Sequence, residues 1–296
     1  MKRIAAIALA LTVPVLASPA MGQNSLADVE IRTEQIAPGV AVLFGRGGNI
    51  AVGYGDDATV IIDDQFAPLS AKIEAAVAEL GATPVKYVVN THWHGDHTGG
   101  NENFGKAGAT IFAHDNVRVR MATPQQRGER VIGPSPDAAL PVVTFAQGLK
   151  FHLNGDTISL RYLGGGHTDG DSVVFWEEKN IVHMGDLYFN IPGYPFIDVN
   201  SGGNVFNAMR SLDLVIAMVD DETKVIPGHG EMSNKAELVA NRAMIGEAVS
   251  RVSALHAEGL SLDDALAREP LKGIDRGDDG FIDAKAFTRA IWASIG

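Results

Sequence analysis

The sequence of 296 residues contains no cysteine. A metal site in this chain therefore has no thiolate ligand, and a lipid anchor attached to a cysteine is excluded. Disulfides are excluded as well, so the hydrophobic core must be stable without covalent cross-links.

Basic residues are scarce relative to acidic ones. The chain has 24 Lys and Arg against 36 Asp and Glu, a formal net charge of −12, and no run of Lys or Arg. An acidic surface repels the phosphates of nucleic acids. We therefore expect a small-molecule substrate and no nucleic-acid partner, while the oligomeric state stays open.

The N-terminal apolar run is too short to span a membrane. It covers residues 4–16, follows Lys2 and Arg3, and is long enough only for the core of a signal peptide. Small residues offer cleavage sites at residues 18–20 or 20–22, which makes a retained anchor the less favoured alternative. We predict a signal peptide over residues 1–22, export to the periplasm or the medium, and no membrane contact after cleavage.

Residues 23–296 contain two series of strand-like segments, each followed by helical segments. Strand-like patterns occupy residues 29–63, 85–89, 110–113, 142–163, 172–176, 181–184 and 224–226. Helical spacing occurs in residues 69–80, 115–121 and 205–219, and capping pairs begin further helices at Asn234 and Ser261. This order predicts two packed sheets flanked by helices, an α/β architecture in one domain. Residues 122–141, which hold four prolines, are predicted to form a long loop and are a candidate lid.

Seven potential metal ligands are concentrated in four short motifs. They are His92, His94, Asp96 and His97 in HWHGDH, His167 in GGGHTDGD, Asp186 in VHMGDLYF and His229 in IPGHGE. Imidazole together with carboxylate suits Zn²⁺, and Fe or Mn where carboxylates are abundant. A tetrahedral catalytic ion needs only three protein ligands plus water, so seven converging ligands predict two ions.

The first motif directly follows a predicted buried strand, residues 85–89. Ligands at the end of a strand are held in place by a rigid sheet. His92 and His94 alternate with Trp93, so both imidazoles point the same way in an extended segment. We expect Gly95 to let the backbone turn, so that the next two ligands face a neighbouring ion.

The four motifs occur in the order found in the metallo-β-lactamase superfamily, which the chain resembles over nearly all of its mature length. The resemblance rests on residues 88–100 (VVNTHWHGDHTGG), 166–176 (GHTDGDSVVFW), 185–189 (GDLYF) and 227–231 (PGHGE). It implies a four-layer αββα sandwich with the site at one edge, between the sheets.

The resemblance also implies a role for each ligand. The first metal would be held by His92, His94 and His167, the second by Asp96, His97 and His229, and Asp186 would bridge the two. A water held between two metals ionises near neutral pH and can attack a carbonyl. Asp96 would also act as the catalytic carboxylate that orients this nucleophile or carries a proton to the leaving atom.

Two departures from true metallo-β-lactamases concern the substrate. Asp186 stands where subclasses of those enzymes have cysteine or serine, and it resembles the bridging residue of glyoxalase II-like thioesterases and lactonases. Phe189 stands where some of them have a lysine that binds the β-lactam carboxylate. The motif at residues 166–176 nevertheless resembles the lactamase version, and export suits antibiotic hydrolysis.

We therefore interpret the chain as an exported dinuclear zinc hydrolase that opens β-lactams or related cyclic amides and esters. A glyoxalase II-like thioesterase or a lactonase is the alternative. A mononuclear iron oxidoreductase like the persulfide dioxygenases is a further one, although it would not need seven ligands. A binding protein without catalysis is least favoured, because the ligand set is intact.

The remaining histidines have plainer interpretations. His152 is expected to point to solvent from a strand, and His256 to lie at a helix interface. His114 and His183 are candidates for supporting the metal ligands.

Two loops are ambiguous. Residues 275–286, DRGDDGFIDAKA, imitate a calcium loop, but Gly277 and Ala286 replace ligands, so a turn before a C-terminal helix is favoured. The aromatic loop at residues 188–195 is either an apolar lip over the metals or a packed surface loop.

Overall fold

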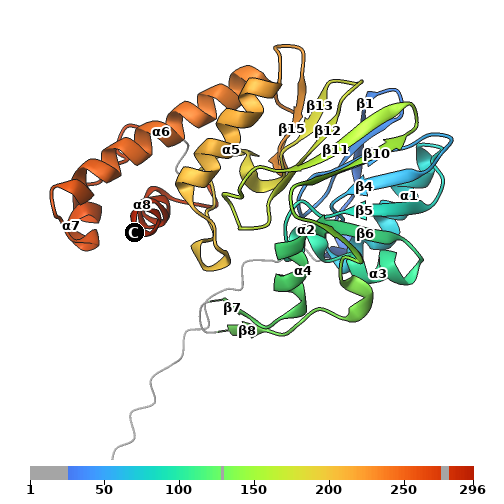
Figure 1. The fold of residues 1–296 in the computed structure, drawn as a ribbon, viewed down its shortest axis with the longest axis horizontal. Coiled ribbons are helices and arrows are strands. Elements are labelled where there is room, and N and C mark those ends of the chain that lie inside the picture. Colours follow the sequence, from blue (N-terminus) through green and yellow to red (C-terminus); the bar gives the residue numbers. More distant parts are fainter. Residues whose placement is uncertain (1–25, 128–129, 275–279) are drawn as a thin grey trace, which may run out of the picture.

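The computed structural model describes residues 26–127, 130–274 and 280–296. The predicted signal peptide, residues 1–22, lies outside these ranges, as do residues 275–279 of the calcium-like segment. Within the described ranges, no helix is both long and apolar enough to cross a membrane. Figure 1 shows strands gathered at the centre and right of the molecule, with helices outside them.

Seven strands form the first sheet, in the order β1-β2-β3-β4-β5-β6-β9. Strands β1 to β4 are antiparallel neighbours, whereas β4, β5, β6 and β9 run parallel. Parallel neighbours need crossover connections, and helices supply much of their length here. The strand bounds are Arg32–Ala37 (β1), Val40–Phe44 (β2), Ile50–Gly53 (β3), Thr59–Ile62 (β4), Val85–Val89 (β5), Thr110–His114 (β6) and Val143–Phe145 (β9).

Five strands form the second sheet, in the order β10-β11-β12-β13-β15. Only its last pair, β13 and β15, is parallel. A small parallel pair joins β14 to β16. The bounds are Gly148–Leu153 (β10), Asp156–Tyr162 (β11), Ser172–Trp176 (β12), Ile181–His183 (β13), Phe189–Asn190 (β14), Lys224–Ile226 (β15) and His229–Gly230 (β16).

One hydrophobic cluster lies between the two sheets. Val60 and Ile62 of β4 pack there with Val174, Trp176 and Ile181 of the second sheet. Ile61, between Val60 and Ile62, points to the opposite face of the sheet, because successive side chains of a strand alternate between its faces. The sheets therefore share an apolar interface.

Helices cover both outer faces. On the first sheet, α1 (Ser70–Glu79) and α3 (Asn101–Lys106) pack Ile73 and Phe104 against Ile61. On the second sheet, α5 (Val205–Met218), α6 (Lys235–Ala257) and α8 (Ala284–Ile295) form another cluster that includes Leu212 and Phe287. The layers run helix, sheet, sheet, helix, which confirms the predicted αββα sandwich (Figure 1).

Two predicted helix starts are confirmed by their caps. The side chain of Asn234 accepts a hydrogen bond from the backbone N–H of Glu237 at 3.0 Å, at the start of α6. Ser261 accepts one from the N–H of Asp264 at 3.1 Å, at the start of α7 (Leu262–Ala267). Each side chain satisfies an amide that the first helical turn leaves unpaired.

The prediction of a plain loop at residues 122–141 is wrong. After α4 (Asp115–Ala122), strands β7 (Gln125–Arg127) and β8 (Arg130–Ile132) pair as an antiparallel hairpin. Val131 and Ile132 on this hairpin are exposed, so the pairing rests on backbone hydrogen bonds more than on burial. A hairpin without a buried face leaves no alternating apolar pattern in the sequence.

Candidate metal centre

The predicted ligands sit where strands from both sheets end. His92 follows β5, Asp186 follows β13 and His229 follows β15 closely, while α2 (Gly95–Thr98) carries Asp96 and His97. Both sheets direct the carboxyl ends of these parallel strands to one edge of the sandwich. The two rigid sheets thus fix side chains that lie far apart in the sequence.

The structure brings all seven side chains together in two groups. One group is His92, His94, His167 and Asp186, and the other is Asp96, His97 and His229. Within each group, one nitrogen or oxygen atom of every side chain lies within 4.8 Å of the others. The division is the one expected for two neighbouring ions.

Asp186 stands between the two groups. Its Oδ2 atom lies 3.7 Å from Nε2 of His92 and 3.5 Å from Nε2 of His167. Its Oδ1 atom lies 3.1 Å from Nε2 of His97 and 3.4 Å from Nε2 of His229. One carboxylate therefore faces both groups, each with a different oxygen.

Hydrogen bonds on the outer side of the first group fix which ring nitrogens carry protons. Nδ1 of His167 donates to the backbone oxygen of Phe196 at 2.7 Å, and Nε2 of His94 donates to Oδ2 of Asp198 at 2.9 Å. The other two ring nitrogens face each other at 2.8 Å, and both are lone pairs when the two rings are neutral. Two lone pairs at that distance repel unless a cation lies against them.

The same logic applies to His92 and His97. Oγ1 of Thr91 donates to Asp63 at 2.8 Å, so it accepts from Nδ1 of His92 at 3.0 Å. Nδ1 of His97 donates to Oδ2 of Asp63 at 2.7 Å. Nε2 of His92 is then a lone pair directed at Asp186 and has no hydrogen-bond partner, while Nε2 of His97 lies 3.1 Å from Oδ1 of Asp186.

Four ring N–H groups thus point outward, and the other nitrogens of those rings converge with carboxylate oxygens. Oδ1 of Asp186 is also buried without a hydrogen bond. Buried acceptors without donors cost free energy, and a divalent cation satisfies them. The residues therefore fit a metal centre of nitrogen and oxygen ligands.

Charges within the metal-free cluster shift its titration strongly. Burial alone lowers the pKa of His229, but Asp186 and Asp96 raise it to about 9. Burial likewise opposes the raised pKa of His97, which the carboxylates of Asp186 and Asp63 hold well above its usual value. Burial lowers the pKa of His167 to about 4. Without a metal, the positive charge beside Asp186 is therefore carried by the protonated rings of His97 and His229.

The carboxylates respond in the opposite sense. Burial would raise the pKa of Asp96, but His97 and His229 lower it to about 2. Burial would also raise the pKa of Asp186, and His97 and His229 hold it well below its usual value instead. Both carboxylates are therefore charged at neutral pH.

Two aspartates that orient the ligands were missed from the sequence. Asp63 contacts His97 directly and His92 through Thr91. Asp198 holds His94 and also accepts from Oγ of Ser201 at 2.6 Å. The position of Asp63 immediately after the apolar strand β4 is a signal that could have revealed it. Asp198 lies on an irregular segment and gives no such signal.

The backbone turns at Gly95 as expected, but the turn does not require a glycine. Gly95 has an ordinary negative φ, and a Cβ there would meet nothing within 4 Å, because helix α2 makes the turn. At two other positions, only a glycine fits, because a side chain would collide with a candidate ligand. A Cβ on Gly48 would lie 2.1 Å from Cε1 of His97, and one on Gly228 would lie 2.1 Å from Oδ1 of Asp186.

Aromatic rings line part of the centre. Phe189, paired with His229 across β14 and β16, stacks on its ring with centroids 5.6 Å apart. The ring of Phe196 stacks on His94 at 5.8 Å and meets His167 edge-on at 5.4 Å. Within the loop at residues 188–195, Phe189 contacts the centre, whereas Tyr188 and Tyr194 are packed in the core, so each alternative holds for part of the loop.

Of the remaining histidines, His152 and His256 lie as expected. His152 is exposed, and His256 packs edge-on against Trp292 between helices, with centroids 4.8 Å apart. His183 is fully buried beneath the centre, where its Nδ1 accepts from the N–H of Gly185 at 3.1 Å. His114 caps α4 and stacks on Tyr162, so its contacts are structural.

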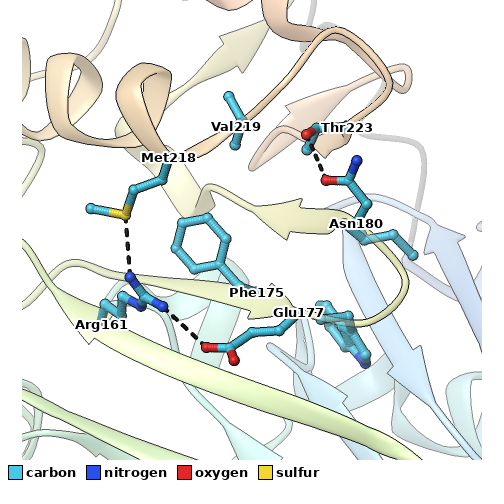
Figure 2. Close-up of a pocket in the computed structure, with 9 residues that line it drawn as sticks. Arg161, Phe175, Glu177, Asn180, Met218, Val219 and Thr223 are labelled. Carbon is cyan, nitrogen blue, oxygen red and sulfur yellow. Dashed lines mark hydrogen bonds and ion pairs between the residues drawn. The ribbon is translucent and has the colours of Figure 1, made fainter.

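A separate hollow of about 280 Å³ lies at the opposite ends of β13 and β15, beside the last turn of α5 (Figure 2). Arg161 there pairs with Glu177 at 3.1 Å, and Thr223 donates to Asn180 at 2.6 Å. These polar groups satisfy one another, and none of the seven clustered side chains lines the hollow. We assign it no ligand.

Three curated relatives share part of the sequence. The chain is 29% identical over 224 residues to a hydroxyacylglutathione hydrolase from Methylococcus capsulatus, covering 73% of this chain and 76% of that protein. It is 25% identical over 172 residues to a type 2 metallo-β-lactamase from Bacteroides fragilis, covering 56% and 61%. It is 26% identical over 192 residues to the α subunit of a 2,4-dinitroanisole O-demethylase from Nocardioides sp. This match covers 63% of this chain and only 54% of that protein.

Solved structures and the family model agree on the fold. The DIM-1 metallo-β-lactamase has a TM-score of 0.61 at 18% identity, covering 74% of this chain and 99% of its own. A stereoselective inverting sec-alkylsulfatase from Pseudomonas sp. has a TM-score of 0.67 at 17% identity, covering 88% and 50%. The model of the metallo-β-lactamase superfamily matches residues 45–229, which include all seven clustered side chains. The chain therefore belongs to the metallo-β-lactamase superfamily and is a metal-dependent hydrolase.

Proposed function

We propose that the protein is an exported dinuclear zinc hydrolase that opens β-lactams or related cyclic amides and esters. The observation that carries the dinuclear part is the position of Asp186, whose two oxygens face two separate groups of histidine nitrogens. The likeness to the Bacteroides fragilis enzyme supports the lactam class. Export rests on the predicted signal peptide.

Each of the seven residues has a task in this proposal. His92, His94 and His167 would hold one zinc, Asp96, His97 and His229 the other, and Asp186 would touch both. Zinc bound in this way supplies Lewis acidity, which polarises a carbonyl and makes water nucleophilic at neutral pH.

Asp96 is the carboxylate best placed to handle a proton. Its side chain is 32% exposed, whereas that of Asp186 is 5% exposed. Its Oδ2 atom lies 3.3 Å from Nε2 of His229, and its low pKa keeps it charged at neutral pH. Asp96 would take the proton from the attacking water and deliver it to the leaving atom.

A thioesterase or a lactonase is the second candidate. The likeness to hydroxyacylglutathione hydrolase extends over more of both chains than the likeness to the lactamase. Residues 187–200 beside the centre hold no Lys or Arg to bind a substrate carboxylate. A missing charge-assisted hydrogen bond weakens binding by about one to two powers of ten, so β-lactam hydrolysis should saturate poorly.

Metal analysis combined with a substrate panel tests the proposal. The mature protein, loaded with zinc and freed of excess metal, should hold about two zinc ions per chain. It should open β-lactams with a high KM and a less affected kcat. Full activity with one ion per chain would refute the dinuclear centre, and a single bound iron would favour the oxidoreductase alternative. Rapid turnover of thioesters or lactones without any β-lactam hydrolysis would establish the second candidate.

A further inference from the structure

The C-terminal part of the chain reaches the metal centre. Phe281 lies outside the matched residues 45–229, yet its ring meets that of Phe196 edge-on at 5.9 Å. Phe196 in turn stacks on His94 and contacts His167. The rings form a row that leads outward from the histidines to Phe281.

The backbone around Phe281 is locked to the loop that carries the inner rings. The N–H of Tyr194 donates to the backbone oxygen of Ile282 at 2.9 Å. The backbones of Gly193 and Gly280 touch so closely that a Cβ on Gly280 would lie 2.1 Å from Cα of Gly193. The position of Phe281 is therefore set by this contact.

Helix α8 supports the same loop from beneath. The ring of Tyr194 stacks on Phe287 with centroids 5.3 Å apart, and Phe287 is fully buried. The hydroxyl of Tyr194 donates to the backbone oxygen of Ile274 at 3.0 Å. The aromatic loop is thus clamped between the metal centre and the C-terminal helices, and the row of rings is already in place before a substrate binds.

Phe281 itself is left largely uncovered. It is 76% exposed, more than any other large apolar side chain among the described residues. A single exposed apolar residue is ordinary. Phe281, however, is held at the outer end of a row of rings that begins at the histidines of the metal centre. At this position it offers a surface for an apolar ligand group.

We propose that Phe196 and Phe281 form an apolar wall that binds the acyl side chain of the substrate. The inference rests on the proposed hydrolase function and specifies its substrate class: carbonyl compounds whose acyl side chain is aromatic or a longer alkyl group. Such a group would lie across the two rings while the carbonyl reaches the centre. Small acyl groups such as acetyl would leave Phe281 in water and gain nothing from it.

Two hydroxamates test binding without any hydrolysis. Hydroxamates chelate zinc, so acetohydroxamate and phenylacetohydroxamate report on the wall when titrated calorimetrically into the zinc-loaded mature protein. Phenylacetohydroxamate should bind about tenfold more tightly, because its ring removes apolar area from water on both surfaces. Phe281→Ala should remove most of that preference and leave the affinity for acetohydroxamate unchanged. Phe281→Trp should retain it.

The control is Val142→Ala, which shortens another exposed apolar side chain, 68% accessible and next to β9. This variant should keep the full preference. Equal affinity of the two hydroxamates for the native protein, or an unaltered preference in Phe281→Ala, would overturn the wall. Failure of both hydroxamates to bind would instead refute the zinc hydrolase itself.

Discussion

Oδ2 of Asp63 lies 2.7 Å from Nδ1 of His97, and both side chains are completely buried. The same oxygen accepts a hydrogen bond from Thr91, whose hydroxyl holds His92. One carboxylate therefore orients a ligand in each of the two groups. Asp63 adopts a φ of 64°, a conformation that non-glycine residues rarely occupy, which indicates that the surrounding structure fixes it in this position.

Asp63→Asn should weaken zinc binding without removing any ligand. The amide keeps the size of the side chain but loses the charge that favours the proton on Nδ1 of His97. Loss of such a supporting partner typically costs about 10- to 100-fold in metal affinity. Competition with a chromophoric chelator measures this affinity, with circular dichroism as the check on folding. Native affinity in the folded variant would mean that Asp63 serves only the packing.

Gly228→Ala should disable the centre, whereas Gly95→Ala should not. A Cβ on Gly228 would lie 2.1 Å from Oδ1 of Asp186 and 2.7 Å from the backbone of Gly185, so the bridging carboxylate must shift. Misplacement by about 1 Å can cost a factor of 10² in rate. Gly95 is the matched control, because it begins α2 in open space. Comparable kcat/KM values for the two variants would show that Asp186 tolerates the shift.

Asp186→Ala and His229→Ala should differ in how many zinc ions they lose. Asp186 faces both groups, so its removal should lower occupancy of both sites, whereas His229 belongs to the second group alone. Zinc content after dialysis at a fixed free-zinc concentration gives the comparison. Equal loss from both variants would contradict the assignment of ligands to sites.

Zinc binding should release protons and weaken as the pH falls. Asp186 and Asp96 outweigh burial and raise the pKa of His229 to about 9, so the metal-free protein holds a proton there at pH 7. A histidine binds zinc as the neutral imidazole. For each proton that zinc displaces, the zinc affinity therefore falls by about tenfold for each unit by which the pH is lowered. Calorimetry in two buffers of different ionisation enthalpy counts the protons. His229→Ala should release about one fewer, and a buffer-independent heat for the native protein would refute the competition.

Much of the fold was predictable because the local patterns are strong. The alternation and apolar runs predicted the strands around β4, β5 and β12, and the Asn234 and Ser261 caps predicted where α6 and α7 begin. The hairpin of β7 and β8 was missed because none of its described side chains is buried, so burial does not shape its sequence pattern. One domain over residues 23–296 stays a prediction.

The seven candidate ligands were predictable because histidine and aspartate cluster in short motifs. The contacts that hold each ligand in place were harder to predict. Gly95 was expected to matter from its place in the motif, yet Gly48 and Gly228, which lie far from it in the sequence, are the glycines where a side chain would collide with a ligand. Such contacts depend on which distant backbones approach each other, and no local pattern records that.

The sequence by itself determined which side chains can bind a metal, because the identity and spacing of nitrogen and oxygen donors are covalent properties of the chain. The absence of cysteine likewise settled that no thiolate takes part. Only the tertiary structure decided that Asp186 faces both groups, that Asp63 and Asp198 orient the rings, and that Phe281 reaches Phe196. These contacts join residues separated by tens to hundreds of positions, and they form only when two sheets and the C-terminal helices pack around a common core.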